Sequence, residues 1–163
     1  MQLYNIAFSG HRKIPEYDLP NVDFGLTQVL AMGYQKKPVV YHTGGAAGFD
    51  SMVFKRVSDH PAAINILHIP FQYQWLALQK FLNKSASEIT DYLASLCPIC
   101  GPVPHDPRMD RDLIYLYQKR NEHMVDAANE LIYYWDGIET GGTWNTIKYA
   151  RKVGVPMRDI REL

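Results

Sequence analysis

Apolar positions along the chain alternate between short continuous runs and longer segments in which they recur every three or four residues. The short runs are rich in β-branched and aromatic residues and predict strands. These strands cover residues 3–8, 38–42, 64–69, 130–135 and 155–160. The longer segments have the spacing of amphipathic helices, and Gly33 and Gly154 are expected to end two of them. These helices cover residues 22–32, 49–58, 74–96, 110–128 and 143–153.

Strands that alternate with helices predict an α/β fold of three layers, in which a mostly parallel sheet lies between helices. The chain has 163 residues, which is enough for one domain with its own core. It contains no internal repeat, linker or low-complexity run, and the proline-rich segment 97–109 is predicted to be a loop. Residues 1–163 are therefore predicted to form a single domain.

The charge balance bears on the class of partner. Lys and Arg together number 17, as do Asp and Glu, so the formal net charge is zero. A general nucleic-acid binder usually has a basic excess, so this balance argues against nucleic acid as a partner. No apolar run approaches the roughly 20 residues of a membrane helix, so no membrane partner is expected. The absence of a signal-peptide pattern and the presence of only two cysteines predict a cytoplasmic location.

Three glycine-containing segments each follow a predicted strand and lead toward a helix. They are Ser9-Gly10, the segment TGGAAG at 43–48, and Gly141-Gly142. Parallel strands place their carboxyl ends at one edge of the sheet, where open α/β sheets bind ligands. Glycine lets the backbone approach a ligand, and a helix N-terminus offers N–H groups to an anion. We therefore expect one shared anion site at this edge.

The candidate ligand-binding residues come from these three segments and from the helix predicted at 110–128. For each segment taken by itself, a tight strand-to-helix turn without any ligand is the alternative. The candidates are Ser9, Gly10, His11, Arg12, Thr43, Gly44, Gly45, Ala46, Gly48, Asp50, Arg120, Asn121, Gly141, Gly142, Thr143, Trp144 and Thr146.

Two charged candidates have more than one interpretation. Arg120 lies on the apolar stripe of its helix, where an unpaired guanidinium is costly to bury. A phosphate at the sheet edge would suit its fork of donors. Alternatively, Arg120 pairs with a structural carboxylate or extends its charge to solvent. Asp50 either contacts the ligand or interacts with the dipole of the helix at 49–58.

The segment ETGGTWNT at 139–146 can present Gly141, Gly142 and Thr143 to a phosphate at the start of the last long helix. The alternative is a plain loop in which Thr143 only caps that helix. Trp144 either stacks on a base or belongs to the core or its rim. His11 either binds phosphate or closes a turn.

Cys97 and Cys100 form one C-x-x-C pair, with His105 and Asp106 nearby. A structural zinc site needs more ligands than a single such pair supplies. We therefore predict two thiols whose role stays open, and neither a metal nor a cofactor.

The succession FSGHR, HTGGAAGFD, YQKRNEHMVDAANELIYYWDG and GGTWNTIKYARKVGVP resembles the SLOG superfamily. That superfamily consists of Rossmann-like domains that include the DprA/Smf and LOG proteins. The resemblance covers nearly the whole chain and is closest to the YpsA-like branch. It implies a Rossmann-like fold, a homodimer, and a nucleotide-derived ligand at the strand edge, such as a nucleoside monophosphate or an ADP-ribose-like molecule.

The LOG proteins are phosphoribohydrolases that carry an arginine-containing helix motif followed by P-G-G-x-G-T-x-x-E. The resemblance puts Arg120 in the arginine position and matches Gly141 and Gly142 to the two adjacent glycines. The position of the final glutamate holds Lys148. A lysine does not stabilise the positive charge of an oxocarbenium-like transition state. The catalytic residue is therefore unknown, and the candidates are Glu139, Arg120 and Asp136.

Three functions compete at this stage. The preferred one is binding of a phosphate-bearing nucleotide or nucleotide-derived signal by a sensor, carrier or sequestering module. The alternative is a nucleotide N-glycosidase of the LOG type that releases a base. Single-stranded DNA binding of the DprA type ranks third, because the neutral net charge argues against it.

Overall fold

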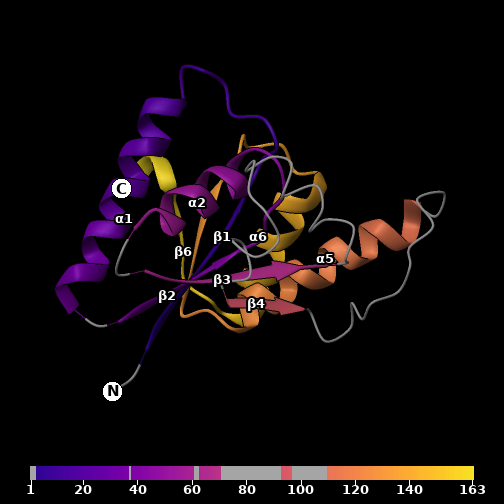
Figure 1. The fold of residues 1–163 in the computed structure, drawn as a ribbon. Helices are drawn as coiled ribbons and strands as arrows, with labels where there is room; N and C mark the ends of the chain where they lie inside the picture. Colours follow the sequence, from indigo (N-terminus) through magenta and orange to yellow (C-terminus); the bar gives the residue numbers. More distant parts are fainter. Residues whose placement is uncertain (1–2, 37, 61–62, 71–92, 97–109) are drawn as a thin grey trace.

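The computed structural model describes residues 3–36, 38–60, 63–70, 93–96 and 110–163 (Figure 1). The strands in these residues are β1 (Tyr4–Gly10), β2 (Val39–Thr43), β3 (Ile64–Ile69), β4 (Leu93–Leu96), β5 (Glu130–Tyr134) and β6 (Met157–Asp159). The helices are α1 (Leu19–Lys36), α2 (Phe49–Ser58), α5 (Asp110–Asp126), α6 (Gly141–Val153) and the 3₁₀ helix η1 (Ile160–Glu162).

The strands form one six-stranded sheet in the order β4-β3-β2-β1-β5-β6, and all five neighbouring pairs are parallel. The prediction of a Rossmann-like α/β fold with a mostly parallel sheet is thereby confirmed. The chain builds the sheet outward from β1 to β4 and then returns to the other side of β1 with β5. The strand order therefore reverses between β1 and β5. Ligands of open α/β sheets bind at this kind of switch point.

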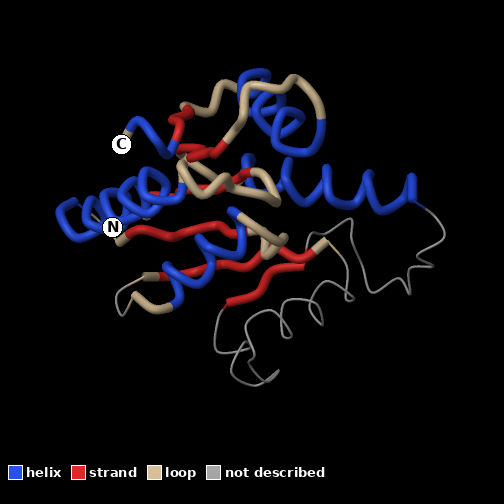
Figure 2. The backbone as a smooth tube through the Cα atoms, turned by 90° about the horizontal axis from the view of Figure 1, so that it is seen from above, coloured by secondary structure: helices blue, strands red, loops and turns tan. Residues whose placement is uncertain are grey.

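Helices cover both faces of the sheet (Figures 1 and 2). On one face, α1 and α2 bury side chains such as Leu26 and Val53 against Phe8 and Ile132 of the central strands. On the other face, Met124 and Val125 of α5 and Ala150 of α6 pack against Ala7 and Leu131. The alternation of faces along β1 and β5 follows from the two-residue period of strands. Both layers hold the carboxyl ends of β1 and β5 at the same edge.

Two predicted helices end differently in the structure. The segment predicted as a helix at 74–96 ends in a strand, because 93–96 pairs with β3 as β4. Four apolar residues fit either period, so pairing with a neighbouring strand decides the outcome. Gly33 does not end α1, which continues to Lys36 just before Pro38. A glycine inside a helix lowers its stability but removes no hydrogen-bond donor. Residues 74–92 and the loop predicted at 97–109 lie outside the described residues.

The described helices include none that is long and apolar enough to cross a membrane.

Candidate functional site

A cavity of about 640 Å³ opens at the carboxyl edge of the sheet, beside the reversal of strand order. Four parts of the chain line it: the end of β1 with the loop after it, the loop and helix start after β2, one face of α5, and the segment from the end of β5 into α6. Its lining residues are Ser9, Gly10, His11, Arg12, Lys13, Ala46, Asp50, Ile114, Tyr117, Gln118, Arg120, Asn121, Asp136, Gly141, Gly142, Thr143 and Asn145.

The cavity brings together most of the residues singled out in the sequence. Those that line it are Ser9, Gly10, His11, Arg12, Ala46, Asp50, Arg120, Asn121, Asp136, Gly141, Gly142 and Thr143. The convergence of three loops on one edge is therefore a property of this fold. The others, which do not line it, are Thr43, Gly44, Gly45, Gly48, Glu139, Trp144 and Thr146.

Arg120 occupies the back of the cavity and is only 2% exposed. Its Nη1 donates to the carbonyl oxygen of Gly44 and, at 3.4 Å, to that of His68. Its Nη2 lies 3.6 Å from Oδ2 of Asp50. The arrangement matches the alternative in which a structural carboxylate pairs with this guanidinium. Arg120 thereby connects α5 to the loop after β2 and to the end of β3.

Asp50, in the first turn of α2, is the partner of this arginine and is also buried. Burial is the strongest influence on its carboxyl group and raises the pKa of Asp50 to about 6, although the Arg120 guanidinium acts in the opposite direction. An acid with such a pKa changes its charge near neutral pH. Asp50 is therefore the lining carboxyl group best suited to exchange a proton.

Glycines of the loop after β2 are required by packing inside the protein. A side chain at Gly44 would collide with the guanidinium of Arg120 and the carboxyl group of Asp50. Gly48 has a φ of 83°, and a side chain there would collide with the backbone of Arg12. Close approach to other parts of the chain thus accounts for both glycines. The buried Thr43 donates its hydroxyl hydrogen to Oδ1 of Asn65, at 2.9 Å, and does not line the cavity.

The start of α6 differs from that loop. Gly141 has a φ of 82°, which favours glycine, but the backbone of Gly142 is not left-handed. A side chain at Gly142 would meet no described atom within 4 Å. Nothing within the described fold therefore explains why position 142 lacks a side chain, although it borders the cavity. Thr140 is the N-cap residue of α6, and its side chain makes no capping hydrogen bond to the helix.

Thr143 does not cap α6, because the helix already begins at Gly141 and Thr143 lies within its first turn. The alternative in which Thr143 caps the helix is therefore wrong. Its side chain is buried and lines the cavity. Thr146 instead donates its hydroxyl hydrogen to the carbonyl oxygen of Gly142, at 2.9 Å.

Trp144 lies outside the cavity and stacks on Trp135, with ring centres 5.0 Å apart and an angle of 11° between the planes. Lys148 Nζ lies 5.8 Å, and the Arg151 guanidinium 5.3 Å, from the centre of the Trp144 ring. Lys148, at the position of the LOG glutamate, is therefore part of an aromatic and basic cluster. We call Trp135, Trp144, Lys148 and Arg151 the tryptophan cluster.

The acidic candidates differ in their access to the cavity. Glu139 is exposed and does not line it. Asp136 lines it and accepts a hydrogen bond from the backbone N–H of Ile138 at 2.9 Å, which lowers the pKa of this carboxyl group. Nε2 of His11 lies 3.0 Å from Oδ1 of Asp136. Asp136 is therefore charged at neutral pH and suits hydrogen-bond acceptance better than proton donation.

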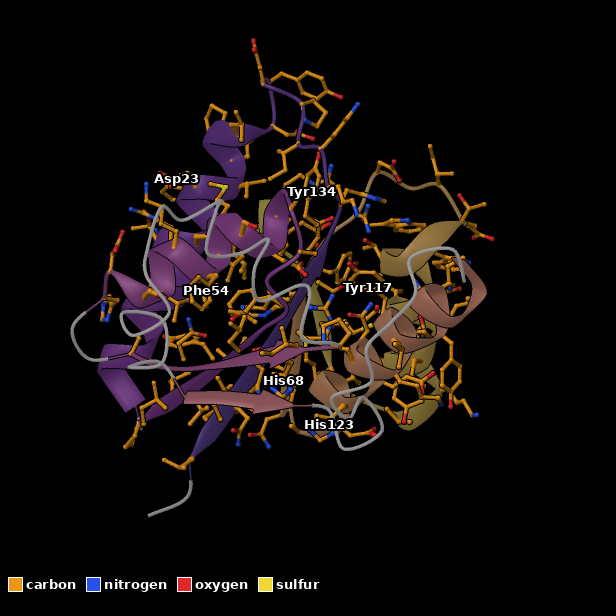
Figure 3. The ribbon with its side chains drawn as sticks, turned by 45° about the vertical axis from the view of Figure 1, so that its right-hand side comes forward. Asp23, Phe54, His68, Tyr117, His123 and Tyr134 are labelled. Carbon is orange, nitrogen blue, oxygen red and sulfur yellow. The ribbon has the colours of Figure 1, made fainter. Side chains whose placement is uncertain are left out.

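Five lining residues were not singled out in the sequence: Lys13, Ile114, Tyr117, Gln118 and Asn145. Ile114, Tyr117, Gln118 and Asn121 are spaced by three, one and three residues, so they share one face of α5. This spacing is visible in the sequence, but periodicity alone does not distinguish a helix face that packs in the core from one that borders a cavity. Figure 3 labels Tyr117 on α5.

A line of buried polar side chains crosses the sheet beneath α5. Nε2 of His42 donates to Oδ1 of Asn5 at 3.0 Å, so its Nδ1 accepts from Nε2–H of His68 at 2.8 Å. Burial lowers the pKa of His42 to about 4 and that of His68 to about 3. The His123 ring of α5 lies 5.3 Å from that of His68 (Figure 3). Both hydrogen-bonded imidazoles are therefore neutral at physiological pH.

Among the described residues, no group of three or more His, Cys, Asp or Glu side chains could hold a metal ion. Cys97, Cys100, His105 and Asp106 lie outside the described residues, so the prediction about them remains open.

Comparison with known proteins places this chain in a family. No family model matches the chain. The chain is 30% identical over 122 residues to the uncharacterized SPbeta prophage-derived protein YoqJ of Bacillus subtilis (strain 168), and the match covers 68% of each protein. The chain belongs to the YoqJ family.

Two solved structures share the fold. DNA processing protein A (DprA) of Streptococcus pneumoniae superimposes with a TM-score of 0.70 at 16% identity, over 96% of this chain and 50% of that protein. DprA of Helicobacter pylori gives a TM-score of 0.61 at 16% identity, over 96% and 64%. This chain thus spans about half to two thirds of those proteins. They share the Rossmann-like α/β fold of this chain, but they add nothing in favour of the YpsA-like branch.

The comparison overturns one prediction. DprA of H. pylori binds single-stranded DNA, so a protein with this fold can bind nucleic acid. The prediction from net charge that nucleic acid is an unlikely partner is therefore wrong. A net charge is a sum over the whole chain and does not report local groups of cations. In this chain Arg12 and Lys13 lie together at the cavity, and Lys148 and Arg151 lie together on α6.

Proposed function

We propose that the cavity binds a phosphate-bearing nucleotide or nucleotide-derived small molecule, with its phosphate at the start of α6. The observation that carries this proposal is Gly142, which borders the cavity although the described fold leaves open space for a side chain there. A phosphate bound to the backbone N–H groups of Gly142 and Thr143 would occupy that space. Helix N-termini favour such anions through their unpaired N–H groups and dipole.

Three cations at the cavity have different roles in this proposal. Arg12 and Lys13 are exposed and line the cavity, so they can move onto a phosphate. Arg120 is held by Gly44, His68 and Asp50. We assign phosphate contact to Arg12 and Lys13, and assign to Arg120 the positioning of the surrounding loops. A guanidinium already bound on two sides has less to offer a ligand than one that faces solvent.

Binding without bond cleavage fits these residues best, as expected of a sensor, carrier or sequestering module. The position of the LOG glutamate holds Lys148, whose side chain lies by Trp144 outside the cavity. The sequence motifs remain the support for the YpsA-like branch and a homodimer, and the cysteine usage remains the support for a cytoplasmic location.

The test is calorimetric titration of the protein with nucleoside monophosphates, using Gly142→Ala as the variant. We expect wild-type binding and at least a tenfold loss in the variant, because the new methyl group takes the place of the phosphate. The free energy of unfolding should stay the same or rise by up to about 1 kcal/mol, since alanine favours a helix more than glycine does. Equal affinity in both proteins would contradict the proposed phosphate position.

A second candidate function is binding of single-stranded DNA. It is favoured by the H. pylori DprA neighbour and by the tryptophan cluster next to the cavity. Aromatic rings flanked by cations are typical of surfaces that bind single strands. In this alternative, the phosphate at Gly142 would belong to a strand that continues over α6.

A further inference from the structure

One face of α5 forms a wall of the cavity and has a chemistry different from that of the other walls. Besides the buried and paired Arg120, it presents Ile114, Tyr117, Gln118 and Asn121, none of which carries a charge. Another wall of the cavity is formed by the N-terminus of α6, where we place the phosphate. A nucleotide has the same division, because one end is charged and the other is a flat heteroaromatic ring.

The first part of this wall is apolar and aromatic. Ile114 is 68% exposed, although it is a large hydrophobic residue, and it borders the cavity. The guanidinium groups of Arg12 and Arg120 each lie 5.8 Å from the centre of the Tyr117 ring. Tyr117 borders the cavity, so its ring can contact a flat partner from the cavity side. Bases stack on aromatic rings and on arginine guanidinium planes in this way.

The second part of the wall carries amide groups. Nε2 of Gln118 donates to Oε1 of Glu122 at 3.2 Å, and Oε2 of Glu122 also accepts from Lys119 Nζ at 2.6 Å. These bonds fix the Gln118 amide and leave its oxygen and its second N–H hydrogen for another partner. Asn121 is 9% exposed, and its amide has no hydrogen-bond partner among the described residues. An amide offers a donor beside an acceptor, which is the pairing that a base edge requires.

We propose that this face of α5 recognises the nucleobase of the ligand, with Tyr117 as the stacking surface and the amides of Gln118 and Asn121 at the base edge. This inference rests on the proposed phosphate site at Gly142. It adds that the cavity distinguishes ligands by their nucleobase, and it names the residues that contact this base. Tyr117 thereby takes the role of base partner that the sequence suggested for Trp144.

The experiment compares nucleoside monophosphates with ribose 5-phosphate, which has the sugar and phosphate but no base. Wild-type protein should bind at least one of the monophosphates ten times more tightly than ribose 5-phosphate. Tyr117→Ala should remove most of this difference and leave the affinity for ribose 5-phosphate unchanged. Gln118→Ala should change the order of preference among adenine, guanine, cytosine and uracil monophosphates.

Tyr115→Ala is the matched control, because Tyr115 lies on the same helix, is 50% exposed and does not line the cavity. It should retain the wild-type preference, and thermal unfolding should show that each variant is folded. Equal binding of nucleotide and ribose 5-phosphate by the wild type would overturn the base-recognition wall and leave the phosphate site standing. A parallel loss of both ligands in a folded Tyr117→Ala would also overturn it. Binding of neither compound by the wild type would overturn both proposals.

Discussion

At the scale of single residues, two arginines that line one cavity have opposite surroundings. Arg120 is buried and surrounded by acceptors, whereas Arg12 is exposed over the Tyr117 ring. The sequence located both residues, since both follow recognisable motifs. It left the role of Arg120 open, because the partner of a buried guanidinium is decided by the packing of distant segments. Gly44 and Asp50 come from another part of the chain and approach Arg120 only in the folded protein.

Replacing these arginines should separate stability from binding. Arg120→Ala leaves the buried Asp50 without its cation and should lower the free energy of unfolding by about 3–5 kcal/mol, measured by urea denaturation. Arg12→Ala should change stability by less than about 0.5 kcal/mol but weaken nucleotide binding. If Arg12→Ala had the same affinity for nucleotide as the wild-type protein, the assignment of this arginine to the phosphate would be wrong.

At the scale of elements, the sequence predicted the type and order of most of the described helices and strands. The bounds of α2 and β3 agree with the prediction, because glycine, proline or β-branched residues mark their ends. The same reasoning missed β4, where the pairing partner decides, and the site-facing side of α5. Periodicity identifies the face of a helix that is apolar, but it does not tell whether that face meets a sheet or a ligand cavity.

The histidines of β2 and β3 predict a particular acid response. Their pKa values are about 4 for His42 and about 3 for His68 in the folded protein, below the ordinary 6.5. The unfolded chain therefore binds more protons below pH 6.5, and stability falls as the pH is lowered toward 4. Asp50 has a raised pKa of about 6, so the folded protein binds its proton more readily than the unfolded chain over the same range. This increases stability as the pH falls and offsets the effect of one of the two histidines. The net slope should be about 1.4 kcal/mol per pH unit between pH 6 and pH 4.

Urea unfolding at a series of pH values measures this slope. His68→Gln keeps a neutral side chain that can donate to His42. It removes one of the protons that the unfolded chain binds in excess, so the slope should fall by about 1.4 kcal/mol per pH unit. A wild-type stability that stays constant from pH 6.5 to pH 4.5 would contradict the assignment of neutral buried imidazoles.

At the scale of the whole molecule, the strand order predicts where the cavity lies, whereas the net charge does not predict which partners the protein binds. The reversal of strand order between β1 and β5 puts the loops after these strands beside the cavity, and the alternating sequence pattern already implied this edge. The zero net charge hides two separate basic groups, Arg12 with Lys13 and Lys148 with Arg151. Arg12 and Lys13 are adjacent in the sequence, and Lys148 and Arg151 lie about one helical turn apart in α6, so the local sequence shows both groups although the total charge does not.

If the protein binds single-stranded DNA, the number of these cations sets an upper limit on how steeply the binding constant falls with salt concentration. Each phosphate contact on a single strand contributes a slope of about −0.7 to the logarithm of the binding constant against the logarithm of salt concentration. Four contacts give a slope of about −3. Trp144→Ala should weaken an oligonucleotide without affecting a mononucleotide, as measured by fluorescence anisotropy and calorimetry. Loss of mononucleotide binding alone would place the tryptophan cluster in the small-molecule site instead.

The central claim is that the cavity holds a nucleotide with its phosphate at the start of α6. A crystal structure of the protein with a bound nucleoside monophosphate tests it most directly. We predict that the phosphate accepts hydrogen bonds from the backbone N–H groups of Gly142 and Thr143, with Arg12 turned toward it and the base against Tyr117. A phosphate bound away from α6, or a nucleotide bound outside the cavity, would contradict this account.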